Sequence, residues 1–177
     1  MRLFDASVRA VTGWDEAWCV RLNRASGLRP VRGFFRAVSR LGDGLFWYAV
    51  MALVLVAGGA SAVGPVLHMV AVGAAGVAVY KWLKTKTSRP RPYQVRSVIR
   101  LGTDPLDQFS FPSGHTLHAV CFSVVITAYY PALAWLVWSF AGLAAVSRVV
   151  LGLHYPTDVL AGAAIGAVIA LGSFALL

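Results

Sequence analysis

Three long stretches of this chain contain no Asp, Glu, Lys or Arg: residues 44–80, 108–147 and 159–177. The first two are about twice the roughly 20 residues that span a bilayer. Each has a proline near its middle, Pro65 or Pro131, where a helix is expected to be interrupted. With 58% hydrophobic and 13% charged residues, the chain has too little polar surface for a soluble globule. The sequence therefore predicts an integral membrane protein.

The uncharged stretches divide into five predicted spanning helices. Their ranges are 45–63, 66–83, 114–130, 133–151 and 157–176. Gly- and Ala-rich segments such as Gly162 to Gly166 favour close approach of helix backbones in lipid. We therefore expect an all-α fold, an integral membrane bundle of five transmembrane helices in which residues 44–177 form a single domain.

Residues 1–43 differ from the rest because they carry eight of the sixteen Lys and Arg residues. Apolar residues recur there at helical intervals, with arginines between them; they are Phe4, Val8, Val11, Trp14, Trp18 and Leu22, then Phe34, Phe35, Val38 and Leu41. Such helices lie in the headgroup layer. We predict an amphipathic interfacial arm that holds a headgroup, gates lateral entry, or has only a structural role. The net charge of +9 lies beside apolar faces, so anionic lipid is favoured over nucleic acid as a partner.

Basic residues and histidines gather in three clusters where uncharged stretches meet polar segments. They are Lys84 and Arg91; Ser113, Gly114 and His115; and Arg148, His154 and Asp158. Three fixed cations and two histidines at one membrane face suit a phosphate group. A lipid phosphate is therefore the first candidate substrate.

The second cluster stands at a predicted helix start. Ser113 can cap that helix, and Gly114 leaves its first free amides open to an anion. His115, in the first turn, can then give a proton to a departing oxygen. An ordinary helix start is the alternative interpretation of this segment.

The other two clusters supply a nucleophile and positive charge. Arg148 ends a predicted helix, and its planar fork suits two phosphate oxygens. Asp158, four residues after His154, can keep one imidazole nitrogen protonated while the other attacks. Lys84 is expected to end the second span, and a proline-stiffened loop can hold Arg91 against the site.

The remaining polar residues receive simpler interpretations. We expect headgroup contacts or solvated charge from Lys81, Lys86, Arg89, Arg96 and Arg100, and solvated carboxylates from Asp104 and Asp107. His68 is expected to be a neutral interhelical contact. A zinc site of His115, His118, His154 and Asp158 is disfavoured, because the adjacent cations repel a divalent ion.

Together the three clusters resemble the tripartite signature of the type 2 phosphatidic acid phosphatase, or lipid phosphate phosphatase, superfamily. Six residues separate Lys84 from Arg91, Pro112 to His115 form the second part, and five residues separate Arg148 from His154. The resemblance covers about residues 40–177. It implies a hydrolase that needs no metal or cofactor, with a shortened bundle whose N-terminal arm covers the site.

The resemblance also implies a role for each motif residue. His154 would be the nucleophile that forms a phosphohistidine, Asp158 its orienting partner, and His115 the acid for the leaving group. The phosphoryl oxygens would be bound by Lys84, Arg91, Ser113, Gly114 and Arg148.

Several functions remain open on the sequence alone. The leading hypothesis is a lipid phosphatase acting on a phosphate monoester or diphosphate; the alternatives are a lipid phosphotransferase that uses the same phosphohistidine, a haloperoxidase, and a non-catalytic channel or scaffold. We expect a multi-pass protein of the cell (inner) membrane with the active site and N-terminus on one face. The positive-inside tendency favours the cytoplasmic face, whereas the family resemblance favours the extracytoplasmic face, which we prefer.

Overall fold

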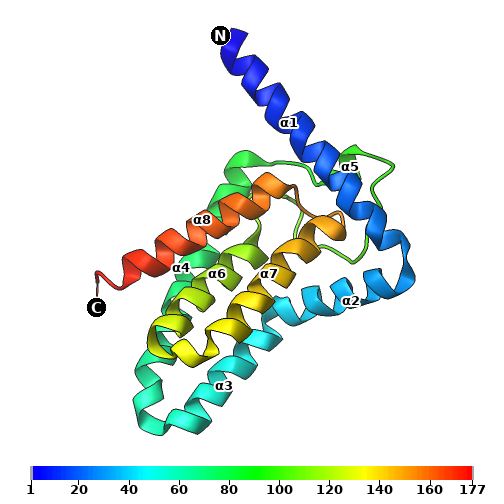
Figure 1. The fold of residues 1–177 in the computed structure, drawn as a ribbon. Coiled ribbons are helices and arrows are strands. Elements are labelled where there is room, and N and C mark those ends of the chain that lie inside the picture. The colour runs from blue at the N-terminus through cyan, green and yellow to red at the C-terminus, as the bar shows by residue number, and fades with distance from the viewer. Residues whose placement is uncertain (1, 177) are drawn as a thin grey trace.

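The computed structural model describes residues 2–176, and this part of the chain is built from helices without strands (Figure 1). The α-helices are α1 (Arg2–Asn23), α2 (Arg29–Arg40), α3 (Phe46–Gly58), α4 (Val63–Thr87), α5 (Pro92–Val95), α6 (Gly114–Tyr129), α7 (Ala134–Val150) and α8 (Pro156–Ser173). The all-α prediction is confirmed.

Five of these helices occupy the ranges predicted for spans. α6, α7 and α8 begin within one residue of the predicted positions, and α6 and α7 also end within one residue. α3 is shorter than predicted because the chain turns at Gly59, whose φ is +56°. α4 is longer and runs to Thr87, so Lys84 lies inside the helix and does not end it.

Three helical runs of the described chain are long and apolar enough to cross a membrane. They are Arg29–Val95, which contains both α3 and α4, Pro131–Val150 and Pro156–Ser173; α6 is a shorter apolar helix. The number of helices that cross the bilayer, and the interfacial position of α1 and α2, stay predictions.

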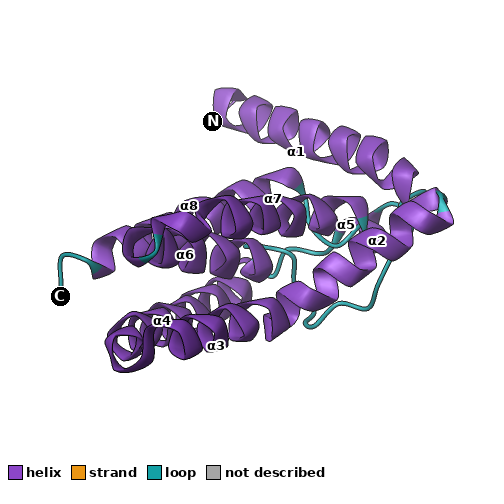
Figure 2. Ribbon diagram, turned by 60° about the horizontal axis from the view of Figure 1, so that its bottom comes forward, coloured by secondary structure: helices purple, strands orange, loops and turns teal. Residues whose placement is uncertain are grey.

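The helix α6 is the centre of the bundle and packs against α4, α7 and α8. Figure 2 shows α1 on one side of this bundle and α3 and α4 on the other, with α2 leading from α1 to α3. α1 contacts α7 and α8, and α2 contacts α7. The N-terminal helices therefore pack against the helices that carry the third motif cluster.

Aromatic packing fixes α3 against the bundle. Phe46 stacks on Phe140 of α7 with ring centroids 3.7 Å apart, and the buried ring of Trp47 contacts Phe122 of α6 at 5.2 Å. Such pairs add about 0.5–1.5 kcal/mol to the burial of their area. The start of α3 is thereby held close to the helix that begins at Gly114.

Close packing of α6 on α8 depends on the small residues predicted to allow it. A Cβ atom at Gly162 or Gly166 would collide with the backbone carbonyl groups of Ser113 and Leu117, respectively. The Ser113 amide also donates to the Asp158 carbonyl at 3.0 Å. The second and third motif clusters are therefore joined through helix backbones in contact.

We expect Gly166→Ala to destabilise the fold by about 1–3 kcal/mol, because the added methyl group must push two helix backbones apart. Thermal unfolding in detergent micelles measures the effect. Gly172→Ala on the same helix is the matched control, since a Cβ there meets nothing within 4 Å, and it should be neutral or slightly stabilising. Equal melting temperatures for the two variants would contradict this packing.

The N-terminal segment packs against the rest of the protein and is not a solvated arm. Asn23 donates to the carbonyls of Arg100 and Val150 at 2.8 and 2.9 Å and accepts from the Arg100 amide. Cys19 of α1 is fully buried. The proposed boundary at residue 43 stays a prediction, but polar and apolar contacts cross it.

Candidate active site

One cavity of about 940 Å³ collects most of the predicted site residues. Those that line it are Lys84, Arg91, Gly114, His115, Arg148 and His154. Apolar side chains form another part of its wall, from α3, α4 and α6; they include Trp47, Met51, Val70, Val77, Tyr80 and Phe122. Segments far apart in sequence therefore meet around a space that is cationic in one part and apolar in another.

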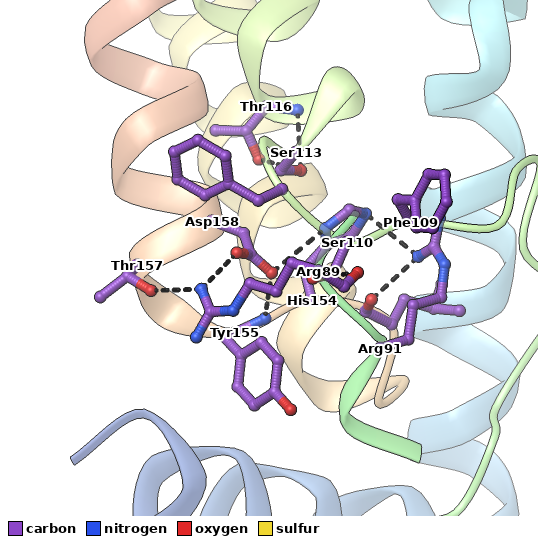
Figure 3. Close-up of polar contacts among 12 residues, drawn as sticks. Arg89, Arg91, Phe109, Ser110, Ser113, Thr116, His154, Tyr155, Thr157 and Asp158 are labelled. Carbon is purple, nitrogen blue, oxygen red and sulfur yellow. Dashed lines mark hydrogen bonds and ion pairs between the residues drawn. The ribbon is translucent and has the colours of Figure 1, made fainter. Parts of the chain in front are cut away.

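His154 lies in the connection between α7 and α8 and is 1% exposed. Arg91 donates to its Nε2 at 3.3 Å and to the Leu153 carbonyl at 2.8 Å (Figure 3). Since arginine only donates, Nε2 is assigned as the acceptor and Nδ1 as the protonated nitrogen. The ring therefore has a lone pair on the nitrogen that faces the cation.

Burial is the largest cause that holds the pKa of His154 well below its ordinary value, followed by repulsion from Arg148, Arg91 and Lys84. Both effects disfavour the imidazolium form. The imidazole is therefore neutral at neutral pH. A neutral ring is the form that can act as a nucleophile.

The two carboxylate oxygens of Asp158 are held by other groups. Asp158 Oδ2 lies 3.7 Å from His154 Nδ1, beyond hydrogen-bond range, and accepts from the Tyr155 amide at 2.8 Å. Asp158 Oδ1 accepts from Arg89 at 2.6 Å. The carboxylate is adjacent to the histidine, but the predicted hydrogen bond to the imidazole is not formed in this structure.

Arg89 does not have the solvated or headgroup position expected for it. It donates to Asp158 at 2.6 Å and to Asp15 of α1 at 2.7 Å, and its guanidinium lies 4.1 Å from the centre of the Tyr155 ring. Asp15 also accepts from the Thr157 amide at 3.0 Å, in the first turn of α8. Arg89 thus links two fully buried carboxylates behind His154, as Figure 3 shows for Asp158.

Ser113 and Gly114 differ in their access to the cavity. The Ser113 side chain caps α6 by accepting from the Thr116 amide, which confirms the predicted cap. Ser113 is fully buried and does not line the cavity, whereas Gly114 does. The Ser113 hydroxyl therefore caps the start of α6, and Gly114 is the residue of this pair that lines the cavity.

Asp107 joins two predicted phosphate-binding cations, so the expectation of a merely solvated carboxylate was wrong. Its Oδ1 accepts from Lys84 Nζ at 2.6 Å and from Arg91 at 2.8 Å, although 39% of the side chain is exposed. Burial raises the pKa of Asp107, but Lys84 and Arg91 outweigh burial and hold it below its ordinary value. Asp107 is therefore ionised at neutral pH.

We expect Asp107→Asn to lower the free energy of unfolding of the phosphate-free protein by about 1 kcal/mol, because the pair is partly exposed. Inorganic phosphate should then raise the melting temperature more in the variant than in the wild type, since phosphate replaces the lost negative charge. Thermal unfolding in detergent with and without phosphate measures both effects. Asp104→Asn is the control. A variant with unchanged stability and phosphate response would contradict the proposed pairing.

Arg148 has no carboxylate partner in the described part of the chain. Its guanidinium is 2% exposed and donates through one nitrogen to Ser39 of α2, while its Nε and the His154 Nδ1 are the buried side-chain nitrogens without a partner among the described residues. A buried, unpaired charge is costly. An anion in the cavity would satisfy it.

His115 lines the cavity, and its Nε2 forms a hydrogen bond with Asp43 at 2.6 Å. Sequence reasoning missed Asp43, Arg89 and Asp15 as partners of the motif residues. Glycines on both sides of Asp43 at a span boundary were a signal for the first; no comparable signal distinguishes Asp15.

The other two histidines have interhelical contacts. His68 is within hydrogen-bond distance of the Tyr129 hydroxyl, at 3.1 Å, and of the Ser173 hydroxyl, at 2.7 Å, which confirms the predicted interhelical contact. The nitrogens of His118 face the carbonyls of Gly114 and Gly73. The four residues considered for a zinc site, His115, His118, His154 and Asp158, thus form hydrogen bonds with different partners.

The sequence of this chain is similar to those of known proteins of one family. A family model described as the PAP2 superfamily matches residues 65–177. Undecaprenyl-diphosphatase BcrC of Bacillus subtilis is 31% identical over 104 residues, which cover 59% of this chain and 53% of that protein. Phosphatidylglycerophosphatase B of Bacillus subtilis is 46% identical over 70 residues, 33% of this chain and 34% of that protein. The chain thus matches about half or less of the length of these relatives.

Among solved structures, the chain is similar to a transmembrane PAP2-type phosphatidylglycerolphosphate phosphatase from Bacillus subtilis, with a TM-score of 0.78 and 24% identity. The match covers 94% of this chain and 86% of that one. This likeness shows a shared fold. With the apolar helices, it identifies a multi-pass membrane protein.

Proposed function

Because this chain belongs to the PAP2 superfamily, we propose that it is a membrane-embedded phosphatase. Its proposed substrate is a lipid phosphate monoester or diphosphate, hydrolysed through a phosphohistidine intermediate. The names of the two relatives, an undecaprenyl-diphosphatase and a phosphatidylglycerophosphatase, support this substrate class. The observation that carries the proposal is a buried Arg148, which has no carboxylate partner among the described residues, in one cavity with a neutral His154.

In the proposed reaction the cations bind the phosphoryl oxygens and stabilise the charge of the transition state. Nε2 of His154 forms a bond to phosphorus while the bond from phosphorus to the leaving oxygen breaks, and His115 gives that oxygen a proton. Water then attacks the phosphohistidine and releases inorganic phosphate. Each well-placed donor lowers the barrier by about 3 kcal/mol.

The apolar part of the cavity is the proposed place of the lipid tail. Trp47 and Met51 of α3, Val70 and Val77 of α4 and Phe122 of α6 line it. The tail would lie between these helices while the headgroup reaches the cations. This arrangement favours a substrate that enters from the bilayer.

Release of inorganic phosphate from a panel of lipids tests the proposal. The purified protein is given phosphatidic acid, phosphatidylglycerophosphate, and an isoprenyl phosphate and diphosphate, with a chelator and no added divalent metal. We expect release from at least one of them and none with His154→Ala. Transfer of phosphate to a second lipid in place of release would support the phosphotransferase alternative. Activity that persists in His154→Ala would exclude the proposed mechanism.

The proposed orientation puts the N-terminus and the active site on the extracytoplasmic face. Some arginines on that face belong to ion pairs or to the site, such as Arg89 and Arg148. They raise the number of basic residues there for reasons unrelated to membrane insertion, which weakens the positive-inside argument for the cytoplasmic face. Arg100→Cys, after Cys19 and Cys121 are replaced, should react with an impermeant thiol reagent in intact cells. Labelling only after lysis would place the site in the cytoplasm.

A further inference from the structure

The junction between α2 and α3 brings a carboxylate to the proposed catalytic acid. Asp43 Oδ1 lies 2.6 Å from His115 Nε2, and both residues line the cavity. Among the described residues, this is the one hydrogen bond that the His115 ring forms. Asp43 lies outside residues 65–177, the range that the family model matches.

Local backbone structure positions this carboxylate. Asp43 lies in Leu41–Leu45, the kink between α2 and α3, and the following Gly44 has a φ of +140°, which a residue with a side chain adopts only with strain. The preceding Gly42 also lacks a side chain where it passes His115, and a Cβ atom there would lie 3.4 Å from the ring. Gly44 therefore lets the chain bend, and Gly42 passes the imidazole at van der Waals distance.

The same position is fixed from the other side by α3. Phe46 and Trp47, three and four residues after Asp43, pack on Phe140 and Phe122, and Phe122 belongs to the helix that carries His115. Asp43 is 26% exposed and the His115 side chain 10% exposed. The pair is therefore held by packed helices at the wall of the cavity.

The charges around His115 make such a partner useful. A general acid must carry its proton before the reaction, but burial, and then repulsion from the guanidinium of Arg148, disfavour an imidazolium in this cavity. A carboxylate in direct contact stabilises the protonated ring through a charge-assisted hydrogen bond. The other ion-pair partner of Asp43 is Arg40, whose guanidinium is 3.9 Å away and largely exposed.

We propose that Asp43 is the positioning residue of the acid His115, holding its ring in place and favouring its protonated form. This inference rests on the proposed phosphatase function. Nε2–H of the protonated ring donates a hydrogen bond to Asp43 and keeps its proton, while the proton on Nδ1 passes to the leaving oxygen as the bond from phosphorus to that oxygen breaks. Nδ1 then recovers a proton from the water that hydrolyses the phosphohistidine, which returns the pair to its initial state.

Substrates with different leaving groups test this role. An alkyl phosphate expels an alkoxide and needs the proton, whereas an alkylphenyl phosphate of the same length expels a stable phenolate and needs it far less. For Asp43→Asn we expect kcat/KM to fall about 10- to 100-fold on the alkyl phosphate and less than about 3-fold on the alkylphenyl phosphate. His115→Ala should show the same selectivity with a larger loss. The double variant should be no worse than His115→Ala.

Arg40→Ala is the matched control, because it removes the other ion-pair partner of Asp43 without touching His115, and it should stay within about 2-fold of the wild type on both substrates. Equal losses on both substrates in Asp43→Asn, or full additivity with His115→Ala, would overturn the proposal. A wild-type protein that hydrolyses neither substrate nor any lipid of the panel would instead refute the phosphatase function itself. Melting temperatures in detergent separate these outcomes from unfolding.

Discussion

Replacing His154 with Ala is expected to reduce phosphate release by at least about 10⁴-fold while the protein stays folded. The variant removes the only group to which the proposed mechanism transfers the phosphoryl group, and loss of a nucleophile has effects of this size or larger. Among the described residues, the imidazole donates no hydrogen bond and accepts one from Arg91. Steady-state phosphate release and thermal unfolding in the same detergent measure the two parts of the prediction.

His68→Gln is the control for this experiment. His68 is also an interhelical histidine, bound to Tyr129 and Ser173, but it does not belong to the cavity wall. The His68→Gln variant should therefore keep its activity within about 3-fold of the wild type. A His154→Ala protein that is folded and retains a tenth of the activity would show that another group attacks phosphorus.

The second large effect is expected from Arg89→Ala. The change leaves Asp15 and Asp158, which are both fully buried, without their shared cation. Breaking a buried ion pair in this way costs about 3–5 kcal/mol, and an unpositioned Asp158 should lower kcat/KM about 10- to 100-fold. Chemical or thermal unfolding in detergent gives the first number and lipid phosphate hydrolysis the second.

Arg96→Ala is the matched control because Arg96 also pairs with an acidic residue of α1, Glu16, but its side chain is 53% exposed. It should leave stability close to that of the wild type, because an exposed ion pair contributes little. Adding Asp15→Asn to Arg89→Ala should restore part of the lost stability, since one unpaired charge is removed. Equal effects of Arg89→Ala and Arg96→Ala would mean that the buried network does not stabilise the fold.

Much of the fold follows from the sequence because lipid imposes a simple rule. An uncharged stretch in a bilayer must be helical to satisfy its backbone, so charge-free runs and two prolines locate α6, α7 and α8 closely. The same rule does not fix where α3 and α4 end. Gly59 adopts a positive φ that composition does not reveal, and the polar end of α4 extends to Thr87.

The cavity could be anticipated from motif spacing, whereas the partners of the motif residues could not. Spacing indicates which residues belong to one site, and six of them line one cavity. Arg89 looked like one more charge in a basic loop, yet it contacts a carboxylate 74 residues away. Such pairings depend on how α1 packs against α7 and α8, which no local pattern encodes.

Trapping a phosphohistidine at His154 tests the proposed mechanism. The wild-type protein is mixed with a lipid whose phosphoryl group carries ³²P, quenched in alkali within milliseconds, and digested. We expect an alkali-stable, acid-labile label on the peptide that contains His154 and no label in His154→Ala. Full hydrolysis activity without labelled protein at any quench time, or label on a different residue, would contradict it.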